Sequence, residues 1–337
     1  MQFKNKKIYI SAITEKGLKL ADHIKEIIPN AKISKYSSDF FSKAFKEADY
    51  IIAIMATGIV VRKIAPLIKT KLKDPGIVVL DENGRFAISL LSGHLGGANE
   101  LAIFLEKKIG SEAVITTATD VNKKISIDIV AKQNNWQIFN PEWIKIINMA
   151  ILKDEKIAGN FPLENYSKFF YFKRLTNLLK SKIKNKIVLS NIKSLTPDNF
   201  LLLLPKNIYI GIGCNRGTNL KEIEETIFLT LEALDRRFEC VKNISSFELK
   251  RDEKGLLEFS EKYNIPLKFY TRDELNQIQN VEKSKYLIKK LGVIGVCEPA
   301  SILSAQRDLK KCMKMKKLLP KLKNGNVTIS VHEVVYA

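Results

Sequence analysis

The chain has 337 residues, 45% of them hydrophobic, which is enough for two or three domains with cores of their own. Its formal net charge of +20 is compatible with nucleic acid, an anionic membrane surface or a polyanionic small molecule as partner. The basic residues are scattered and form no polybasic tail or arginine-rich arm, which argues against nucleic acid. The apolar runs fall short of the roughly 18 residues that span a bilayer, and the run at 8–10 is too short for a signal peptide. We therefore expect a cytoplasmic protein with no nucleic-acid and no membrane partner.

Side chains that bind metals are sparse and dispersed. The cysteines and histidines are Cys214, Cys240, Cys297, Cys312, His23, His94 and His332. No two cysteines form a CxxC pair, and a structural zinc site needs about four clustered ligands. We therefore expect no metal site, and we expect reduced cysteines because disulfides are rare in a reducing compartment.

Residues 1–135 alternate between strands and helices with short links. The expected elements are strands at 7–11 and 49–55 and helices at 15–28 and 59–68. Two β-rich runs, 76–81 and 85–90, flank Asn83-Gly84 and predict a hairpin, because this pair tolerates positive φ at both turn centres. A helix follows the stretch 92–100. The alternation predicts an α/β layer.

The rest of the chain divides at about residue 206. Residues 136–206 fit neither regular period, so we expect a small mixed middle or linking domain. Residues 207–337 are again α/β. Their expected strands are at 208–210, 244–247, 266–270 and 327–331, and their helices are at 219–234, 252–263 and from near 298. Thr218 is the expected N-cap of the first of these helices. The predicted fold class is α/β, with two α/β domains and a small mixed middle segment.

The first candidate site follows the strand at 49–55. There Ala56-Thr57-Gly58 turns the chain into a helix, and free N–H groups at a helix start attract anions. Arg62, about one turn later, can form two hydrogen bonds with a carboxylate. Thr57, Gly58 and Arg62 are therefore candidate substrate-binding residues. The alternative is an ordinary turn with a surface arginine.

The stretch 92–100 is more distinctive. Its candidate residues are Ser92, Gly93, His94, Gly96, Gly97, Asn99 and Glu100. Glycines at this density let a ligand approach the backbone closely, and histidine is the natural proton-transfer group at neutral pH. The alternative is a capped helix start with a partly buried, hydrogen-bonded His94, although glycines there lower helix stability.

A glycine-rich loop at 211–217 opens the last segment. Its third glycine follows the second by four places, whereas a dinucleotide fingerprint requires three. The spacing therefore favours an anion-binding turn that uses Gly211, Gly213 and Arg216 over a Rossmann site. A plain strand-to-helix turn is the alternative.

A second loop, at 292–300, leads into the helix near residue 298. Glu298 there either acts in acid–base chemistry or caps the helix. Cys297 has no histidine beside it in the sequence, so a cysteine nucleophile is not supported.

Several of these motifs together resemble one family. The runs ATGIVVR at 56–62 and LLSGHLGGANELA at 90–102 resemble the N-terminal signature of the CbiG family, and the second run is the more specific. The last segment resembles a module shared by CbiG and CobE proteins, through Gly211-Ile212-Gly213-Cys214, Lys250, Asp252-Glu253, Gly255-Leu256 and Gly295-Val296-Cys297-Glu298. The middle segment carries no such motif.

The resemblance implies a hydrolase that acts on cobalt-precorrin-5A in anaerobic cobalamin biosynthesis, in the class that cleaves carbon–carbon bonds of ketonic substances. Water opens the δ-lactone between a ring A acetate and the carbon-20 bridge, and the bridge carbon with its methyl group leaves as acetaldehyde to give cobalt-precorrin-5B. The partner is thus a tetrapyrrole substrate, and other cobalamin-pathway enzymes are open as further partners. No cofactor is expected, because cobalt belongs to the substrate. The alternative is a non-catalytic carrier of corrinoid intermediates.

The chemistry of that substrate agrees with the motifs. A macrocycle with many acetate and propionate carboxylates calls for helix N-termini, arginines and a positive field. Hydrolysis also needs a base for water and donors for the developing oxyanion. We expect His94 to be the base and the Gly96 and Gly97 amides to be the donors, with Glu298 and Glu100 as second choices for the catalytic residue.

Overall fold

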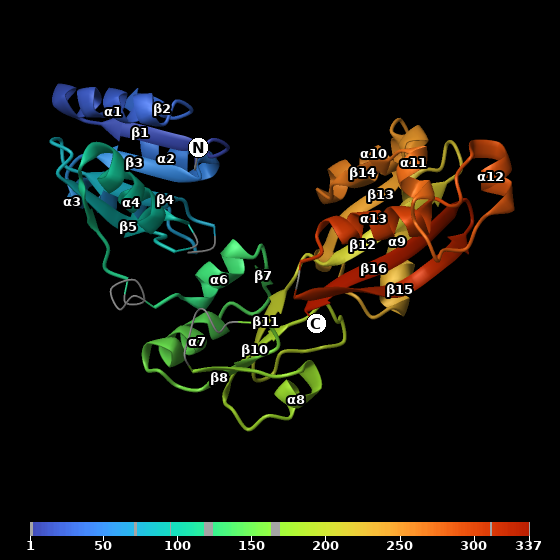
Figure 1. The fold of residues 1–337 in the computed structure, drawn as a ribbon. Helices are drawn as coiled ribbons and strands as arrows, with labels where there is room; N and C mark the ends of the chain where they lie inside the picture. Colours follow the sequence, from blue (N-terminus) through green and yellow to red (C-terminus); the bar gives the residue numbers. More distant parts are fainter. Residues whose placement is uncertain are drawn as a thin grey trace. The chain divides into compact units, whose positions relative to one another are not determined.

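The computed structural model describes residues 3–70, 73–94, 96–117, 124–162, 169–310 and 312–336. The chain forms two compact units, each built from sheets and helices (Figure 1). The main parts of the first are Met1–Asn134 and Ile144–Glu155, and those of the second are Asn135–Trp143 and Phe170–Ala337. The α/β class predicted from the sequence is confirmed. The division into three domains with boundaries near 135 and 206 stays a prediction.

The first unit contains a six-stranded sheet with the order β2-β1-β3-β4-β5-β6. Its strands are β1 (Ile8–Ala12), β2 (Lys32–Lys35), β3 (Tyr50–Ile54), β4 (Gly76–Leu80), β5 (Phe86–Leu91) and β6 (Glu112–Val114). Neighbouring strands are parallel except for β4 and β5, which are antiparallel. The carboxyl end of β5 therefore lies at the opposite end of the sheet from the carboxyl ends of β1, β3 and β4.

Helices cover both faces of this sheet. They are α1 (Glu15–Ile27) and α4 (Ala98–Ile109) on one face, and α2 (Phe40–Glu47) and α3 (Thr57–Ile64) on the other. In β3, Ile52 and Ile54 face the first pair of helices, and Ile51 and Ala53 face the second. Because both faces are buried, the sequence of β3 is a continuous apolar run. The helix α3 ends before the predicted residue 68, since Pro66 restricts the residue before it and has no N–H to donate.

The predicted hairpin is confirmed, but its turn differs from the expected one. Of the two central residues only Gly84 has a positive φ, of 68°. The Asp81 carboxylate accepts hydrogen bonds from the backbone N–H groups of Asn83 and Phe86, each at 2.8 Å. The side chain of Asp81 therefore closes a longer loop, as aspartate commonly does in turns.

Residues 136–206, the predicted mixed middle segment, contribute a five-stranded sheet to the second unit. Its order is β7-β11-β10-β8-β9, with β7 (Gln137–Ile138), β8 (Ile157–Gly159), β9 (Phe170–Phe172), β10 (Asn185–Leu189) and β11 (Leu201–Leu204). The helix α8 (Leu175–Leu179) follows β9, whereas α6 (Ile127–Gln133) and α7 (Trp143–Leu152) belong largely to the first unit. These strands have only two to five residues, which is too short for a visible period.

The remainder of the second unit is a five-stranded sheet with the order β14-β13-β12-β16-β15. The strands are β12 (Ile208–Cys214), β13 (Val241–Phe247), β14 (Leu267–Tyr270), β15 (Met313–Asn324) and β16 (Val327–Tyr336). The helices α9 (Leu220–Ala233) and α10 (Lys254–Tyr263) cover one face, and α13 (Cys297–Arg307) packs on the other. The short helices α11 (Arg272–Asn276) and α12 (Lys285–Leu291) lie in the connection before α13.

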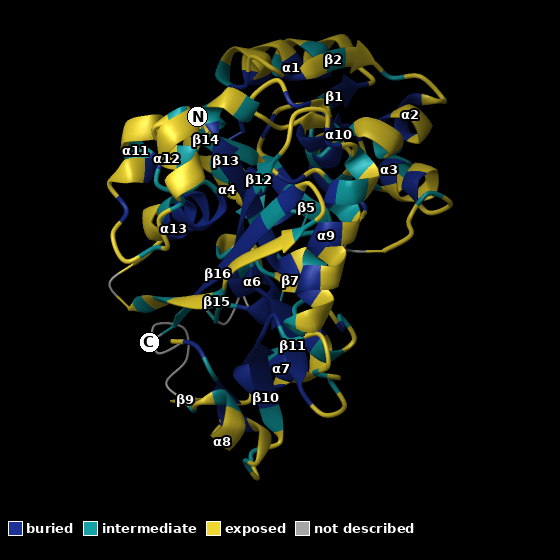
Figure 2. Cartoon of the chain, turned by 90° about the vertical axis from the view of Figure 1, so that its right-hand side faces the viewer, coloured by how far each residue is buried: buried dark blue, intermediate teal, exposed yellow. Residues whose placement is uncertain are grey.

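Two features of this sheet differ from the sequence analysis. Asn219, not Thr218, is the N-cap of α9, because the side chain of Asn219 accepts a hydrogen bond from the N–H of Glu222 at 2.9 Å. The strand β15 was not predicted; it is lysine-rich, contains Pro320 beside a register shift, and is exposed along most of its length (Figure 2). Lysine, proline and bulges are typical of an edge strand, and they weaken the sequence signal for a strand.

The contact between β12 and α13 depends on a glycine. An ideal Cβ atom at Gly211 would lie 1.7 Å from the carbonyl oxygen of Cys297. Gly211→Ala therefore has to displace the backbone of α13, and we expect it to lower the free energy of unfolding by about 3 kcal/mol or more. Gly213→Ala is the matched control on the same strand, where the Cβ would meet the rotatable Thr328 Oγ1 at 2.6 Å. Urea unfolding followed by circular dichroism measures both, and equal losses would contradict this account.

Candidate functional site

The loop at 92–97 leads from β5 into α4, and the packing of the loop itself requires its glycines. An ideal Cβ atom on Gly96 would lie 2.3 Å from Ser92 Cβ. Gly97 has a φ of 78°, and a Cβ atom there would lie 2.4 Å from Tyr50 Oη. The Gly97 N–H also donates a hydrogen bond to the His94 carbonyl at 3.0 Å. The glycines therefore have a structural reason to be present, and the Gly97 amide is already bonded within the loop.

The polar side chains in and beside this loop differ in their hydrogen bonds and in their exposure. Asn99 is buried; its Oδ1 accepts a hydrogen bond from Ser89 Oγ at 2.6 Å and its Nδ2 donates to Thr117 Oγ1 at 3.2 Å. Ser92 has a φ of 54°, and its Oγ is buried with no hydrogen-bond partner among the described residues. Glu100 is exposed in the first turn of α4. Asn99 thus holds the loop, while Ser92 carries the backbone strain that is common at functional sites.

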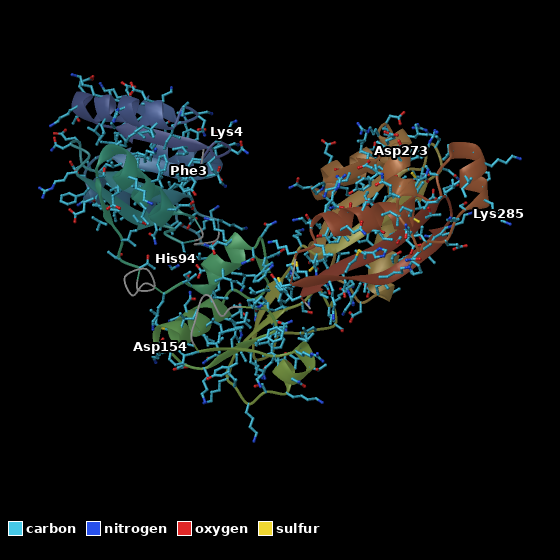
Figure 3. All side chains as sticks on the ribbon, viewed as in Figure 1. Phe3, Lys4, His94, Asp154, Asp273 and Lys285 are labelled. Carbon is cyan, nitrogen blue, oxygen red and sulfur yellow. The ribbon has the colours of Figure 1, made fainter. Side chains whose placement is uncertain are left out.

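His94 lies against the start of α6 (Figure 3). Its Nδ1 is 3.2 Å from Asp128 Oδ2 and 3.3 Å from Ser126 Oγ. The side chain of His94 is 14% exposed and that of Asp128 is 4% exposed, so the pair is largely shielded from water. A buried carboxylate beside an imidazole holds the ring in one orientation.

Asp128 has a further partner on α7. Asn148 Nδ2 donates a hydrogen bond to Asp128 Oδ1 at 2.9 Å, and Asn148 Oδ1 accepts one from the Ile127 N–H at 2.9 Å. Burial raises the pKa of the Asp128 carboxyl, but the hydrogen bonds from His94 and Asn148 outweigh this burial and lower the pKa to about 2. The carboxylate is therefore charged throughout the neutral range.

Ser126, Asp128 and Asn148 were not among the site residues predicted from the sequence. Ser126-Ile127-Asp128 is an ordinary helix start, with a serine at the N-cap and an acidic residue in the first turn. Nothing in such a pattern indicates a partner that lies 34 residues earlier in the chain. Only the tertiary structure brings the carboxylate to His94.

Thr57, Gly58 and Arg62 do not lie with His94. They occupy the start of α3, at the carboxyl end of β3, whereas the 92–97 loop follows β5 and contacts Tyr50 and Gly76 at the other end of the sheet. Arg62 is exposed, and its Nη1 donates a hydrogen bond to the Gly58 carbonyl at 3.2 Å. The carboxyl end of parallel strands is where ligands commonly bind in open α/β sheets. The predicted residues of the first unit therefore form two separate groups.

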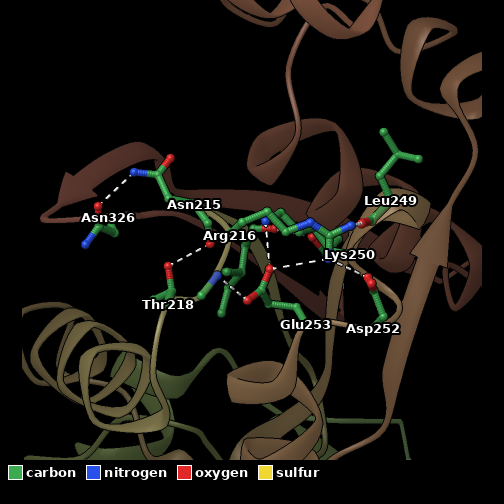
Figure 4. Close-up of polar contacts among 11 residues, drawn as sticks. Asn215, Arg216, Thr218, Leu249, Lys250, Asp252, Glu253 and Asn326 are labelled. Atoms are coloured by element: carbon green, nitrogen blue, oxygen red, sulfur yellow. Dashed lines mark hydrogen bonds and ion pairs between the residues drawn. The ribbon is translucent and has the colours of Figure 1, made fainter.

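The predicted loop at 211–217 is shorter than expected, because Gly211 and Gly213 lie within β12 and pair with β16. The turn that follows, at 215–217, binds an anion that comes from the protein itself (Figure 4). The buried Glu253 carboxylate accepts hydrogen bonds from the Gly217 N–H and from Lys250 Nζ, each at 2.8 Å. Arg216 donates to Asp252 Oδ1 at 2.5 Å and to the Leu249 carbonyl at 2.7 Å. Of the residues predicted to bind a substrate carboxylate, Arg216 is thus bonded to groups of the turn that follows β13.

Glu298 is buried in the first turn of α13, where its Oε1 lies 2.7 Å from Lys317 Nζ on β15. Gly211 and Gly213 lie beside this start of α13. Between α13 and β16, His332 Nδ1 is 2.9 Å from Ser301 Oγ, and both residues are buried. Burial of His332, together with the charge of Lys317, lowers the pKa of His332 to about 4. The Ser301 hydroxyl thus joins His332 to the backbone carbonyl of Glu298.

Two further observations concern the described ranges as a whole. No helix in those ranges is long and apolar enough to cross a membrane. In the same ranges, no three His, Cys, Asp or Glu side chains are grouped so that they could hold a metal ion.

Comparisons with known proteins place the chain. Residues 39–120 match the family model described as Cobalamin synthesis G N-terminal, and residues 208–332 match Cobalamin synthesis G C-terminus. A protein of Priestia megaterium named cobalt-precorrin-5A hydrolase is 34% identical, covering 99% of this chain and 90% of its own. The Salmonella typhimurium protein of that name is 31% identical over 79% of both chains. A crystal structure of a cobalamin biosynthesis protein G homologue from Sulfolobus solfataricus is 26% identical, covers 99% of both chains and has a TM-score of 0.42.

Glu253→Ala tests the internal anion. The substitution leaves the Lys250 ammonium, which is 15% exposed, and the Gly217 N–H without their carboxylate. We expect the free energy of unfolding to fall by about 3–5 kcal/mol, as for other broken buried ion pairs. Asp252→Ala is the matched control, since the neighbouring carboxylate is 74% exposed, and its loss should stay within about 1 kcal/mol. A larger loss for Asp252→Ala than for Glu253→Ala would refute the assignment.

His332 makes stability depend on pH. The unfolded chain binds a proton at His332 below pH about 6.5, whereas the folded chain does so only near pH 4. Between these values the unfolded state binds more protons, so stability falls as the pH falls, by up to roughly 3 kcal/mol. His332→Gln should flatten this part of the curve, and His23→Gln, at an exposed position, should leave it unchanged. Denaturant unfolding from pH 7 to pH 4 measures the slope.

Proposed function

Because this chain belongs to the cobalamin synthesis protein G family, CbiG, we propose that it hydrolyses cobalt-precorrin-5A. The observation that carries the proposal is the match, over nearly the whole chain, with a relative that bears the name of this hydrolase. The substrate is accordingly a tetrapyrrole. In the proposed reaction water opens the δ-lactone, and the carbon-20 bridge with its methyl group leaves as acetaldehyde.

His94 is the proposed base. The Asp128 carboxylate beside Nδ1 supports this role, because it orients the ring and stabilises the imidazolium that forms when the ring takes a proton from water. The Gly97 amide is bonded to the His94 carbonyl, so the Gly96 amide remains the proposed oxyanion donor of the loop. Glu298, paired with Lys317, and the exposed Glu100 remain second choices.

The proposed substrate-binding residues of the first unit form two groups, at opposite ends of its sheet. Ser92, Gly93 and Asn99 lie next to His94, and Thr57, Gly58 and Arg62 form a second group that can serve a peripheral carboxylate of a large macrocycle. Gly211, Gly213 and Arg216 stay proposed residues; the two glycines lie within β12, and Arg216 is bonded to Asp252. The net charge of +20 favours capture of a polycarboxylate.

The remaining parts of the proposal concern the setting of the reaction. We propose that the protein works in the cytoplasm without a cofactor of its own, because the cobalt arrives with the substrate. Other enzymes of the cobalamin pathway are the proposed protein partners. Gel filtration of the purified protein with the enzyme that makes its substrate tests such a partnership directly.

Replacement of His94 tests the function and the base together. Loss of a general base typically slows a reaction by about 10²- to 10⁴-fold. We expect His94→Ala to slow acetaldehyde release from cobalt-precorrin-5A by this factor while the substrate still binds. His94→Gln, which hydrogen-bonds but is not basic, should be nearly as slow, and the exposed His23→Ala should be unaffected.

The outcomes separate the alternatives. Wild-type protein that binds the substrate and releases no acetaldehyde is a corrinoid carrier, and the hydrolase proposal then fails. Near wild-type turnover by His94→Gln means that His94 only positions the loop or the substrate, and that Glu298 is the next residue to replace.

A further inference from the structure

The orientation of the Asn148 amide determines which oxygen of Asp128 faces His94. Asn148 Oδ1 accepts a hydrogen bond from the Ile127 N–H at 2.9 Å. An N–H group can only donate, so the amide oxygen of Asn148 has to face it, and the Nδ2 group has to face the other way. Nδ2 is then 2.9 Å from Asp128 Oδ1. The backbone of α6 therefore selects the amide orientation, and residue 128 has to present an acceptor to Asn148.

The same constraint passes on to the histidine. Oδ1 of Asp128 accepts from Asn148, and Oδ2 lies 3.2 Å from His94 Nδ1. The carboxylate, whose pKa lies near 2, has no proton to donate at neutral pH. A further neighbour of Nδ1 is the hydroxyl of Ser126, which can accept as well as donate. A neutral His94 ring therefore satisfies Asp128 only when its proton is on Nδ1.

We propose that Asp128 and Asn148 are positioning residues that hold the proton of His94 on Nδ1, so that Nε2 carries the lone pair that removes a proton from water. This inference rests on the function proposed above. Nε2 takes the proton as the water oxygen bonds to the lactone carbonyl. The electron pair of the broken acyl–oxygen bond goes to the bridge-carbon oxygen, and the Asp128 carboxylate balances the charge of the imidazolium.

Asp128→Asn tests the proposal, because it exchanges one oxygen for an NH₂ group without changing the volume. Asn148 still donates, so the amide oxygen of the introduced asparagine has to face it and the introduced NH₂ group faces His94 Nδ1. That NH₂ group donates to Nδ1 and moves the proton of the ring to Nε2. We expect kcat to fall by about 10²- to 10⁴-fold with KM changed less than about threefold, since the base is lost and the substrate contacts remain.

The double variant Asp128→Asn with Asn148→Asp is the matched rescue. The aspartate introduced on α7 still accepts from the Ile127 N–H with one oxygen, and its other oxygen accepts from the NH₂ group of the asparagine introduced on α6. The amide oxygen of that asparagine then faces His94 Nδ1 and restores the proton there. We expect the double variant to recover at least about tenfold of the lost kcat, while lacking the carboxylate charge next to the ring. A purely structural role for the pair predicts no such recovery.

The tautomer can be read without substrate. The chain has three histidines, and ¹⁵N NMR of histidine-labelled protein near pH 8 distinguishes a protonated Nδ1 from a protonated Nε2. We expect His94 to carry the proton on Nδ1 in the wild type and the double variant, and on Nε2 in Asp128→Asn. His23 and His332 serve as internal references that should not change, and thermal unfolding checks that each variant is folded.

Each result bears on one of the two proposals. A His94 proton on Nε2 in the wild type, or the same tautomer in Asp128→Asn as in the wild type, overturns the inference whatever the activity. If Asp128→Asn does not fold, the wild-type spectrum and the double variant still decide it. Absence of acetaldehyde from wild-type protein overturns the function alone, because the NMR spectra are recorded without substrate.

Discussion

The close packing of the 92–97 loop against the amino ends of β3 and β4 is the constraint on which the candidate site depends. The backbone of Gly96 lies so near Gly76 that a Cβ atom on Gly76 would be 2.5 Å from the Gly96 carbonyl oxygen. On the other side of the loop, the side chain of His94 is directed to the start of α6, where it meets Asp128. Preorganisation of this kind is what a catalytic base requires.

The two units use buried carboxylates in different ways. In the second unit Glu253 satisfies Lys250 and the Gly217 N–H, so the anion-binding turn is complete without a ligand. In the first unit Asp128 is bonded to Asn148 and directed at an imidazole, a group that can change its protonation state near neutral pH. A carboxylate that serves only stability, such as Glu253, needs a partner that stays charged, such as Lys250. We propose that the Asp128 carboxylate serves catalysis, because its partner is an imidazole that can accept and release a proton.

The proposed reaction needs few groups from the protein. Lactone opening calls for a base and an oxyanion donor, and the departure of acetaldehyde follows from the electrons of the released bridge-carbon oxygen. In the proposal His94, held by Asp128, is the base, and the Gly96 N–H is the oxyanion donor. We propose that the large remainder of the substrate is bound through its carboxylates, for which scattered positive charge and helix starts are suitable chemistry.

The sequence alone determined the α/β class, most of the strands and helices outside residues 136–206 and the hairpin at Gly84, because period and turn chemistry are local properties. Glycine density is local too, and it made the stretch around His94 a candidate site. The separation of Arg62 from His94 to opposite ends of one sheet was decided by the antiparallel placement of β5, and that is a property of strand order. The internal anion at Gly217 and the pairing of His94 with Asp128 were likewise decided by the tertiary structure. A hydrogen bond between residues 34 or 36 positions apart depends on where the chain folds back, and no local pattern of residues encodes that distance.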